Sequence, residues 1–245
     1  MPQRRRRVFF LGYHVSTAIG KAANRMKTTP GRWLRKGVLA LAFPAQTKKD
    51  GGSLMLEGDL ADITERFNKG ATGGTSPFKN AGLMIDRKTF TEDVVAKHSG
   101  ARTHLQDILL PVKEVPKEFF IPEKQLKDWA YLKGSKKEKR KNKVNGFAYN
   151  YAEGAMAFPD VLDRPARTII TGEGGTSPSR FKHVVRTSDG RLRRLTPVEV
   201  ERLNMFPDGH TIGASDSRRA FLMGNALVTG VIERTAKALL KHING

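Results

Sequence analysis

The chain has 245 residues, of which 38% are hydrophobic, and this is enough apolar material for one or two packed domains rather than a disordered tail. Its 44 basic and 24 acidic side chains leave a net charge of +20, which favours a polyanionic partner, most commonly nucleic acid. Because the chain contains no cysteine, it has no disulfide, no thiolate metal site and no thiolate nucleophile of its own.

The N-terminus combines a run of arginines with a short apolar stretch. Arginines occupy positions 4–7, and the following Val8–Leu11 ends at a glycine, which is typical of a short buried strand. In a strand, Gln3, Arg5 and Arg7 alternate onto one face, so we expect these three hydrogen-bond donors to converge on one site.

The region from about residue 16 to residue 118 is irregular. Short apolar runs at 37–43 and 82–85 are separated by Gly, Pro, Lys and Asp, and this pattern predicts a loop-rich and strand-rich region. Short helices are expected within Leu105–Leu110 and Gln125–Leu132.

A dense basic run, KGSKKEKRKNK, occupies Lys133–Lys143 and contains seven basic residues and one glutamate. One interpretation is a solvated, mobile loop, and the other is a loop that tracks phosphates and makes binding salt-dependent. The two interpretations are compatible. A second strand is predicted at Arg167–Thr171, directly before the glycine-rich segment 172–178.

The C-terminal fifth begins with a clear helix start. Thr196 is expected to cap the helix, Pro197 to occupy its first turn, and Glu199 to close a capping box. This pattern predicts a helix from Pro197 to about Met205.

Two more helices are expected after it. Asp216 or Ser217 can cap a short one that ends at Gly224. Apolar residues that recur every three to four positions from Leu227 onward predict a last amphipathic helix closed by 244–245, with an apolar face that must be buried.

Two further classes of protein are excluded by pattern. No apolar run approaches the roughly 18 residues that a membrane span needs, and no signal-peptide cleavage site follows the arginines, so we expect a soluble, cytoplasmic and nucleoid-associated protein. No metal site is predicted, because no ligand spacing is found among the histidines at 14, 98, 104, 183, 210 and 242.

Three segments, in order along the chain, resemble motifs of the DNA cytosine-5 methyltransferases. Residues 2–12 (PQRRRRVFFLG) are similar to the eighth of the ten motifs of this family, residues 194–208 (RLTPVEVERLNMFPD) to the ninth, and residues 223–228 (MGNALV) to the tenth. The chain therefore resembles the C-terminal part of such an enzyme, with the target-recognition domain between the eighth and ninth motifs.

The resemblance implies an α+β protein. It would contain the edge strand and C-terminal helices of a Rossmann-like α/β methyltransferase domain, plus a strand- and loop-rich target-recognition domain. The implied boundaries are residues 1–45 for the edge of the catalytic domain, 46–192 for target recognition, and 193–245 for the helices that return to the catalytic domain.

The resemblance also implies roles for individual residues. Methylation of cytosine requires the base to be extruded from the duplex, and the groups that hold it must compensate for the lost stacking. Arg7 would contact the flipped cytosine, while Arg5 and Gln3 would hold the backbone and neighbouring active-site groups. Gly224 and Asn225 would lie beside the pocket of the cofactor S-adenosylmethionine, with helix capping as the alternative role of Asn225.

Target reading is expected between residues 164 and 186, where permissive glycines accompany polar and basic side chains. The expected contacts to duplex DNA are made by Arg4, Thr168, Thr171, Ser179, Arg180, Lys182 and His183. The helix of the ninth motif resembles one that braces this domain, so Glu199 and Arg202 are expected to be structural.

Three catalytic elements of the family have no counterpart here in the expected order: a Pro-Cys nucleophile that attacks carbon 6, a Glu-Asn-Val segment and a glycine-rich cofactor loop. In the family all three precede the eighth motif, with which this sequence starts. Phe43–Gln46 (FPAQ) resembles the nucleophile motif with alanine in place of cysteine, but it follows the eighth motif.

The chain alone is therefore predicted to be inactive, because it supplies no thiolate. The leading hypothesis is the DNA-recognition half of a split methyltransferase, whose partner is an N-terminal half that carries the cysteine and most of the cofactor site. The alternative is a stand-alone basic DNA-binding remnant, and a third interpretation from charge alone is an RNA-binding protein.

Overall fold

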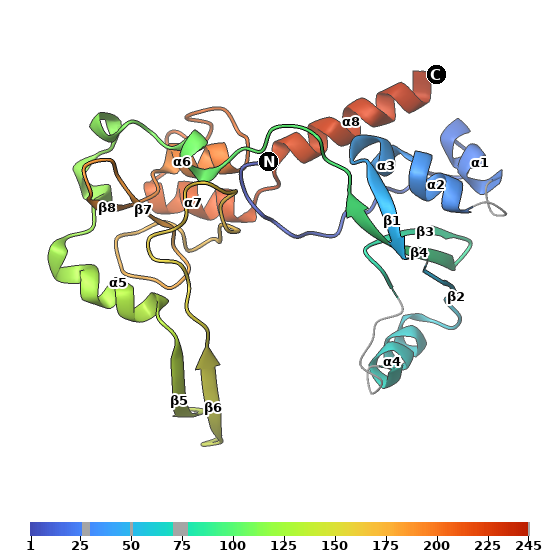
Figure 1. The fold of residues 1–245 in the computed structure, drawn as a ribbon. Coiled ribbons are helices and arrows are strands. Elements are labelled where there is room, and N and C mark those ends of the chain that lie inside the picture. Colours follow the sequence, from blue (N-terminus) through green and yellow to red (C-terminus); the bar gives the residue numbers. More distant parts are fainter. Residues whose placement is uncertain (26–29, 50, 71–77, 245) are drawn as a thin grey trace. The chain divides into compact units, whose positions relative to one another are not determined.

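The computed structural model describes residues 1–25, 30–49, 51–70 and 78–244, and the chain forms two compact units of mixed helix and strand (Figure 1). Unit 1 contains Met1–Arg7 and Ala101–Val231, and unit 2 contains Val8–Gly100 and Ile232–Gly245. The chain therefore passes between the units after residues 7, 100 and 231.

Unit 2 has a small antiparallel sheet with its longest strand, β4, paired on both edges. β3 pairs along most of β4, while β2 pairs with its first half and β1 with its second half. The elements are α1 (Ala18–Arg25), α2 (Pro30–Lys36), α3 (Val38–Ala42), β1 (Ala45–Lys49), β2 (Ser53–Met55), α4 (Leu60–Gly70), β3 (Ala81–Ile85) and β4 (Lys88–Ala96).

The helical part of unit 2 has its own small apolar core. Val38 and Ala42 of α3 pack with Ala238 from the C-terminal helix α8 (Thr229–Asn244). Trp33 lies edge-on to both Tyr13 and His242, with ring centroids 5.8 and 5.7 Å apart.

Unit 1 is built from short 3-10 turns, two hairpins and the C-terminal helices. Its core combines Leu105, Ile169, Val185, Leu203 and Met223, which come from segments far apart in the sequence. The elements are η3 (Leu105–Ile108), η4 (Val112–Glu114), η5 (Lys117–Phe119), η6 (Glu123–Gln125), α5 (Leu126–Lys133), β5 (Lys136–Lys141), β6 (Ala148–Glu153), β7 (Val184–Arg186), β8 (Leu192–Arg194), α6 (Pro197–Leu203), α7 (Asp216–Asn225) and the start of α8.

The predicted start of α6 is confirmed. The Thr196 hydroxyl accepts a hydrogen bond from the Glu199 backbone at 3.3 Å, and the Glu199 carboxylate accepts one from the Thr196 backbone at 2.8 Å. The fully buried Glu199 also pairs with Arg193 at 2.7 and 2.8 Å and accepts a bond from the Leu110 backbone. The capping box thereby ties α6 to β8 and to the segment after η3.

Both predicted apolar strands are wrong. Val8–Leu11 has no strand pairing, and Val8 and Phe10 are 77% and 93% exposed, because this stretch is where the chain leaves unit 1. Arg167–Thr171 is also irregular, and its neighbour Ala166 forms only an isolated parallel bridge with Gln3.

Several other predictions are wrong in detail, and two short helices are confirmed. The basic run expected as a loop contains β5, and the region around residues 16–118 contains helices α1 to α4 beside its strands. The N-cap of α7 is Ser215, and not Asp216 or Ser217. Its hydroxyl accepts a hydrogen bond from the Arg218 backbone N–H at 3.4 Å. The short helices expected near residues 105 and 125 are present as η3 and α5.

Candidate nucleic-acid interface

The N-terminal segment is fixed in unit 1 by its backbone and by Gln3. The Arg4 backbone donates to the Ala166 carbonyl at 2.8 Å, and the Ala166 backbone donates to Pro2 at the same distance. The buried Gln3 amide donates to the Leu203 carbonyl at 3.0 Å and to the Asn204 side chain at 2.6 Å. Residues 200 positions apart are therefore in direct contact.

Arg5 makes a second connection on the same side. Its guanidinium donates to the Ile169 carbonyl at 3.0 Å and to the Gly224 carbonyl at 2.8 Å, so it joins the irregular segment 166–171 to the end of α7. Partial burial, and to a lesser extent the positive charge of Arg7, lowers the pKa of Arg5 below its ordinary value.

Arg4 and Arg7 are more exposed than Gln3 and Arg5. The Arg7 side chain is exposed and donates to the Arg6 carbonyl at 2.7 Å. Arg4 is also exposed, and its carbonyl accepts a bond from the Thr168 hydroxyl at 2.5 Å. Of the three donors expected to converge, Gln3 and Arg5 come together inside the unit, while Arg7 is exposed.

Gly224 is needed for the close approach of two segments. A Cβ atom there would lie 2.3 Å from the Thr171 backbone nitrogen and 2.5 Å from the Ile170 carbonyl carbon, closer than real atoms pack. Asn225 is exposed at the end of α7, where its amide donates to the Phe221 carbonyl at 3.1 Å. The tenth-motif segment therefore lies directly against the segment that contains Thr171.

Lys182 and His183, expected to read DNA, lie inside unit 1. Lys182 donates to the carbonyls of Gly175 and Ser177 at 3.1 and 2.8 Å, and burial followed by the charge of Arg194 lowers its pKa. The fully buried His183 ring lies 3.0 Å from a carboxylate oxygen of Glu173. In this conformation both residues shape the glycine-rich segment 172–178, and their contact with DNA stays a prediction.

Arg180 holds the base of the β5–β6 hairpin. Its guanidinium donates to the Leu132 and Gly134 carbonyls at 3.1 and 3.2 Å, before β5, and lies 3.1 Å from the Glu153 carboxylate at the end of β6. The nearby Ser179 hydroxyl accepts the Phe181 backbone N–H at 3.3 Å. The predicted recognition residues therefore adjoin the basic hairpin.

A buried ionic cluster, which no sequence pattern indicated, lies next to this segment. Asp160 accepts two bonds from Arg167, at 2.7 and 3.2 Å, and lies 3.9 Å from the Lys133 ammonium. Burial, the largest single effect, opposes ionisation of Asp160, but the hydrogen bonds and charge of Arg167, the nearby His183 and the Val184 backbone N–H together hold the pKa of Asp160 below its ordinary value. Burial also lowers the pKa of Lys133 to about 8, against the opposing charge of Asp160.

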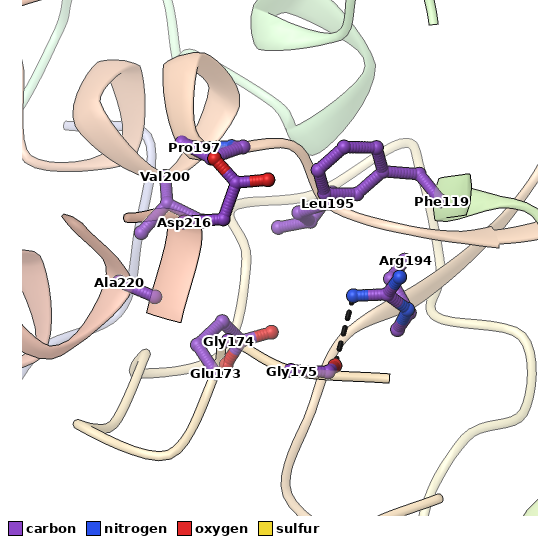
Figure 2. Close-up of a pocket in the computed structure, with 10 residues that line it drawn as sticks. All are labelled: Phe119, Glu173, Gly174, Gly175, Arg194, Leu195, Pro197, Val200, Asp216 and Ala220. Carbon is purple, nitrogen blue, oxygen red and sulfur yellow. Dashed lines mark hydrogen bonds between the residues drawn. The ribbon is translucent and has the colours of Figure 1, made fainter. Parts of the chain in front are cut away.

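A small cavity lies beside the ninth-motif segment (Figure 2). Its free volume is about 10 Å³, room for roughly one water molecule. Figure 2 shows Arg194 pointing at the Gly175 carbonyl, to which it donates at 2.8 Å, and Phe119 on the same side. This cavity is therefore part of the packing between β8 and the glycine-rich segment and is too small for a cofactor.

A larger hollow of about 430 Å³ lies between η4 and the β7–β8 turn. Leu109, Leu162 and Val185 are among its lining residues, with Arg186 and Thr187 at the polar side. Neither hollow is lined by Gly224 or Asn225. Sequence patterns could not predict this hollow, because its walls come from four separate segments.

Neither a metal-binding cluster nor a membrane-spanning helix is present among the described residues. No group of three or more His, Asp or Glu side chains there is arranged to hold a metal ion. Among the helices of those same ranges, none is both long and apolar enough to cross a bilayer.

Comparison with known proteins identifies the family. The model of the C-5 cytosine-specific DNA methylases matches residues 1–241 of the chain. The chain belongs to this family. It is 36% identical over 244 residues to the type II methyltransferase M.Sau3AI of Staphylococcus aureus, which covers 98% of this chain and 55% of that protein.

Other relatives match shorter parts of the methylase chain. It is 26% identical over 153 residues to the type II methyltransferase M.HpaII of Haemophilus parainfluenzae, covering 56% of the chain and 40% of that protein. The match to the S. pombe Dnmt2 methyltransferase structure covers 79% of the chain and 66% of that protein, at 13% identity and a TM-score of 0.40. The chain thus spans about half the length of the curated relatives it matches.

C-5 cytosine DNA methyltransferases use S-adenosylmethionine as methyl donor. Asn225 offers an exposed amide, whereas the buried Gly224 packs against the backbone of Ile170 and Thr171, so their place beside the cofactor stays a prediction. Neither residue lines either of the two hollows described above.

Proposed function

We propose that these 245 residues form the DNA-recognition part of a DNA cytosine-5 methyltransferase. Methyl transfer from S-adenosylmethionine to carbon 5 of cytosine in a specific duplex site would require a cysteine-bearing segment outside them, the N-terminal half of the enzyme. Support comes from family membership, from the absence of any cysteine, and from a span of 55% of the S. aureus relative. The recognition region would occupy residues 46–192, between a catalytic edge at 1–45 and the helices of 193–245.

One observation carries the proposal: the three family-like segments meet in space. Gln3 contacts Asn204 and Arg5 contacts Gly224, so the eighth-motif segment touches both the ninth and the tenth. These contacts define a corner of unit 1, and the exposed Arg7 lies two residues further along the chain.

In the proposed complex, the residues of this corner have different roles. Gln3 and Arg5 fix the segment, and the exposed Arg7 reaches the flipped cytosine as a cationic hydrogen-bond donor. Asn225 contributes to the cofactor side. The Rossmann-like sheet would belong to the cysteine-bearing segment.

The exposed apolar residues of the chain support a docking partner of this kind. Val8 and Phe10 are 77% and 93% exposed, and Leu240 of α8 is 59% exposed. Exposed apolar side chains that gather into one patch are typical of surfaces that bind another protein segment. We propose that they pack against the cysteine-bearing half.

The test is transfer of a labelled methyl group to duplex DNA. The chain alone should transfer none, and a mixture with a co-expressed cysteine-bearing methyltransferase segment should transfer it. Sequence-selective DNA binding without methylation in either sample would instead favour the stand-alone DNA-binding protein. A folded mixture that neither binds nor methylates DNA would refute both functions.

A further inference from the structure

The β5–β6 hairpin of unit 1 has two chemically different faces. In an antiparallel pair, residues directly opposite each other share a face, and the faces alternate along each strand. One face carries Lys136, Glu138 and Arg140 opposite Glu153, Tyr151 and Tyr149. The other face, called the lysine face here, carries Lys137, Lys139 and Lys141 opposite Ala152, Asn150 and Ala148.

The first face satisfies its own charges. Arg140 donates two bonds to Glu138, at 2.9 and 3.0 Å, and its guanidinium carbon lies 3.5 Å from the centroid of the Tyr151 ring. Lys136 lies 3.7 Å from the Glu153 carboxylate. These pairs hold the basic side chains against the hairpin and leave this face with little unpaired charge.

The lysine face has no such compensation. Lys137, Lys139 and Lys141 are all exposed, and the three side chains opposite them are uncharged. Within residues 1–25, 30–49, 51–70 and 78–244, no acidic group forms an ion pair with any of the three. Like charges side by side on a strand repel each other, so a polyanion outside the chain would stabilise this arrangement.

We propose that the lysine face binds the phosphate backbone of duplex DNA next to the bases read by the recognition segment. This inference rests on the proposed function and names the surface that supplies affinity. Alternate strand positions are about 6.7 Å apart, so the three ammonium groups follow a line on which several phosphates of one DNA strand lie within reach. A two-stranded ribbon also matches the width of the DNA major groove.

The hairpin is fixed relative to the recognition segment. Arg180 binds carbonyls before β5 and the Glu153 carboxylate at the end of β6, and it belongs to the segment expected to read the target. Phosphate contacts position a protein on DNA without reading its sequence. The lysine face therefore sets affinity and register, whereas selectivity comes from elsewhere in the unit.

The experiment measures binding of the 245-residue chain to fluorescent duplex DNA over a series of salt concentrations. A variant with Lys137→Gln, Lys139→Gln and Lys141→Gln should bind more weakly. The slope of log affinity against log salt should become shallower by about 2.7, because each lost phosphate contact contributes about 0.9. A charge-matched control carries Lys113→Gln, Lys117→Gln and Lys124→Gln, at exposed positions outside the hairpin, and should keep the slope.

A second measurement needs no variant. Acetylation of lysine amines, read by mass spectrometry, should slow at Lys137, Lys139 and Lys141 when DNA is added, and not at the three control positions. A normal salt slope in the hairpin variant, or equal acetylation with and without DNA, would overturn the inference while DNA binding stands. Failure of the unmodified chain to bind duplex DNA would overturn the proposed function as well. Tighter hairpin-dependent binding to duplex RNA would reassign the lysine face to RNA.

Discussion

The connection made by Arg5 leads to a prediction that separates two arginines only two residues apart. Arg5→Ala removes hydrogen bonds to the Ile169 and Gly224 carbonyls, at 3.0 and 2.8 Å, between segment 166–171 and α7. Arg7→Ala removes a charge of equal size from an exposed side chain. Only the first change should destabilise unit 1.

The magnitude follows from the contacts. A hydrogen bond from a charged donor contributes about 1.5–3 kcal/mol, and truncation leaves two carbonyls without their partner. Because Arg5 is only partly buried, water can replace part of the loss, so we expect about 2–3 kcal/mol for Arg5→Ala. Arg5→Lys retains the charge but reaches one carbonyl at most, and should give about half this loss.

The assay is urea unfolding followed by tryptophan fluorescence. The chain has two tryptophans, and Trp129 is fully buried in unit 1 while Trp33 belongs to unit 2. A Trp33→Phe background therefore reports on unit 1 alone. In that background the Arg5→Ala midpoint should fall by about 1 M urea.

Two results would refute the reasoning. One is an Arg5→Ala midpoint within error of the background protein, which would mean that the two hydrogen bonds contribute no net stability. The other is an equal loss for Arg7→Ala, because an exposed arginine should change the free energy of unfolding by less than about 0.5 kcal/mol.

Three further predictions use the same fluorescence assay. Gly224→Ala should destabilise unit 1 by about 1–3 kcal/mol, because the new methyl group collides with the Thr171 backbone; an unchanged midpoint would contradict that close approach. Arg193→Met should cost about 3–5 kcal/mol by leaving the Glu199 carboxylate buried without its partner, and adding Glu199→Gln should recover part of it. The pKa of Lys133 is about 8 in the folded chain, against 10.5 for the free side chain. Between pH 8 and 10.5 the unfolded chain therefore holds a proton that the folded chain has lost, so the free energy of unfolding should rise with pH over this window. This rise should be absent in Lys133→Met.

Sequence patterns predicted the elements whose signals are local. The Thr196–Glu199 capping box determines its own geometry within four residues, so the start of α6 could be located. The three family-like segments indicated the family for a similar reason, because each is contiguous in the sequence. The contact between Gln3 and Asn204, in contrast, was expected only as convergence on a site, and its partners came from the structure.

The failures concern features that depend on distant partners. Val8–Leu11 has the apolar composition of a strand, but no strand of the described chain pairs with it. The basic run forms β5 because β6, which begins seven residues after β5 ends, supplies cross-strand hydrogen bonds and the carboxylate of Glu153. The burial of His183 likewise depends on Glu173 and could not be inferred from a polar residue in a basic segment.

The most direct test of the central claim is the methyl-transfer rate of a mixture that contains Arg7→Ala in this chain and an unmodified cysteine-bearing segment. Arg6→Ala, the adjacent exposed arginine, is the matched control. If Arg7 holds the flipped cytosine, its variant should lose about 100-fold in rate with DNA affinity reduced only a few-fold, as for removal of one donor from an active site, while the control stays near normal. A normal rate with Arg7→Ala would contradict the assignment of this chain to the active-site edge.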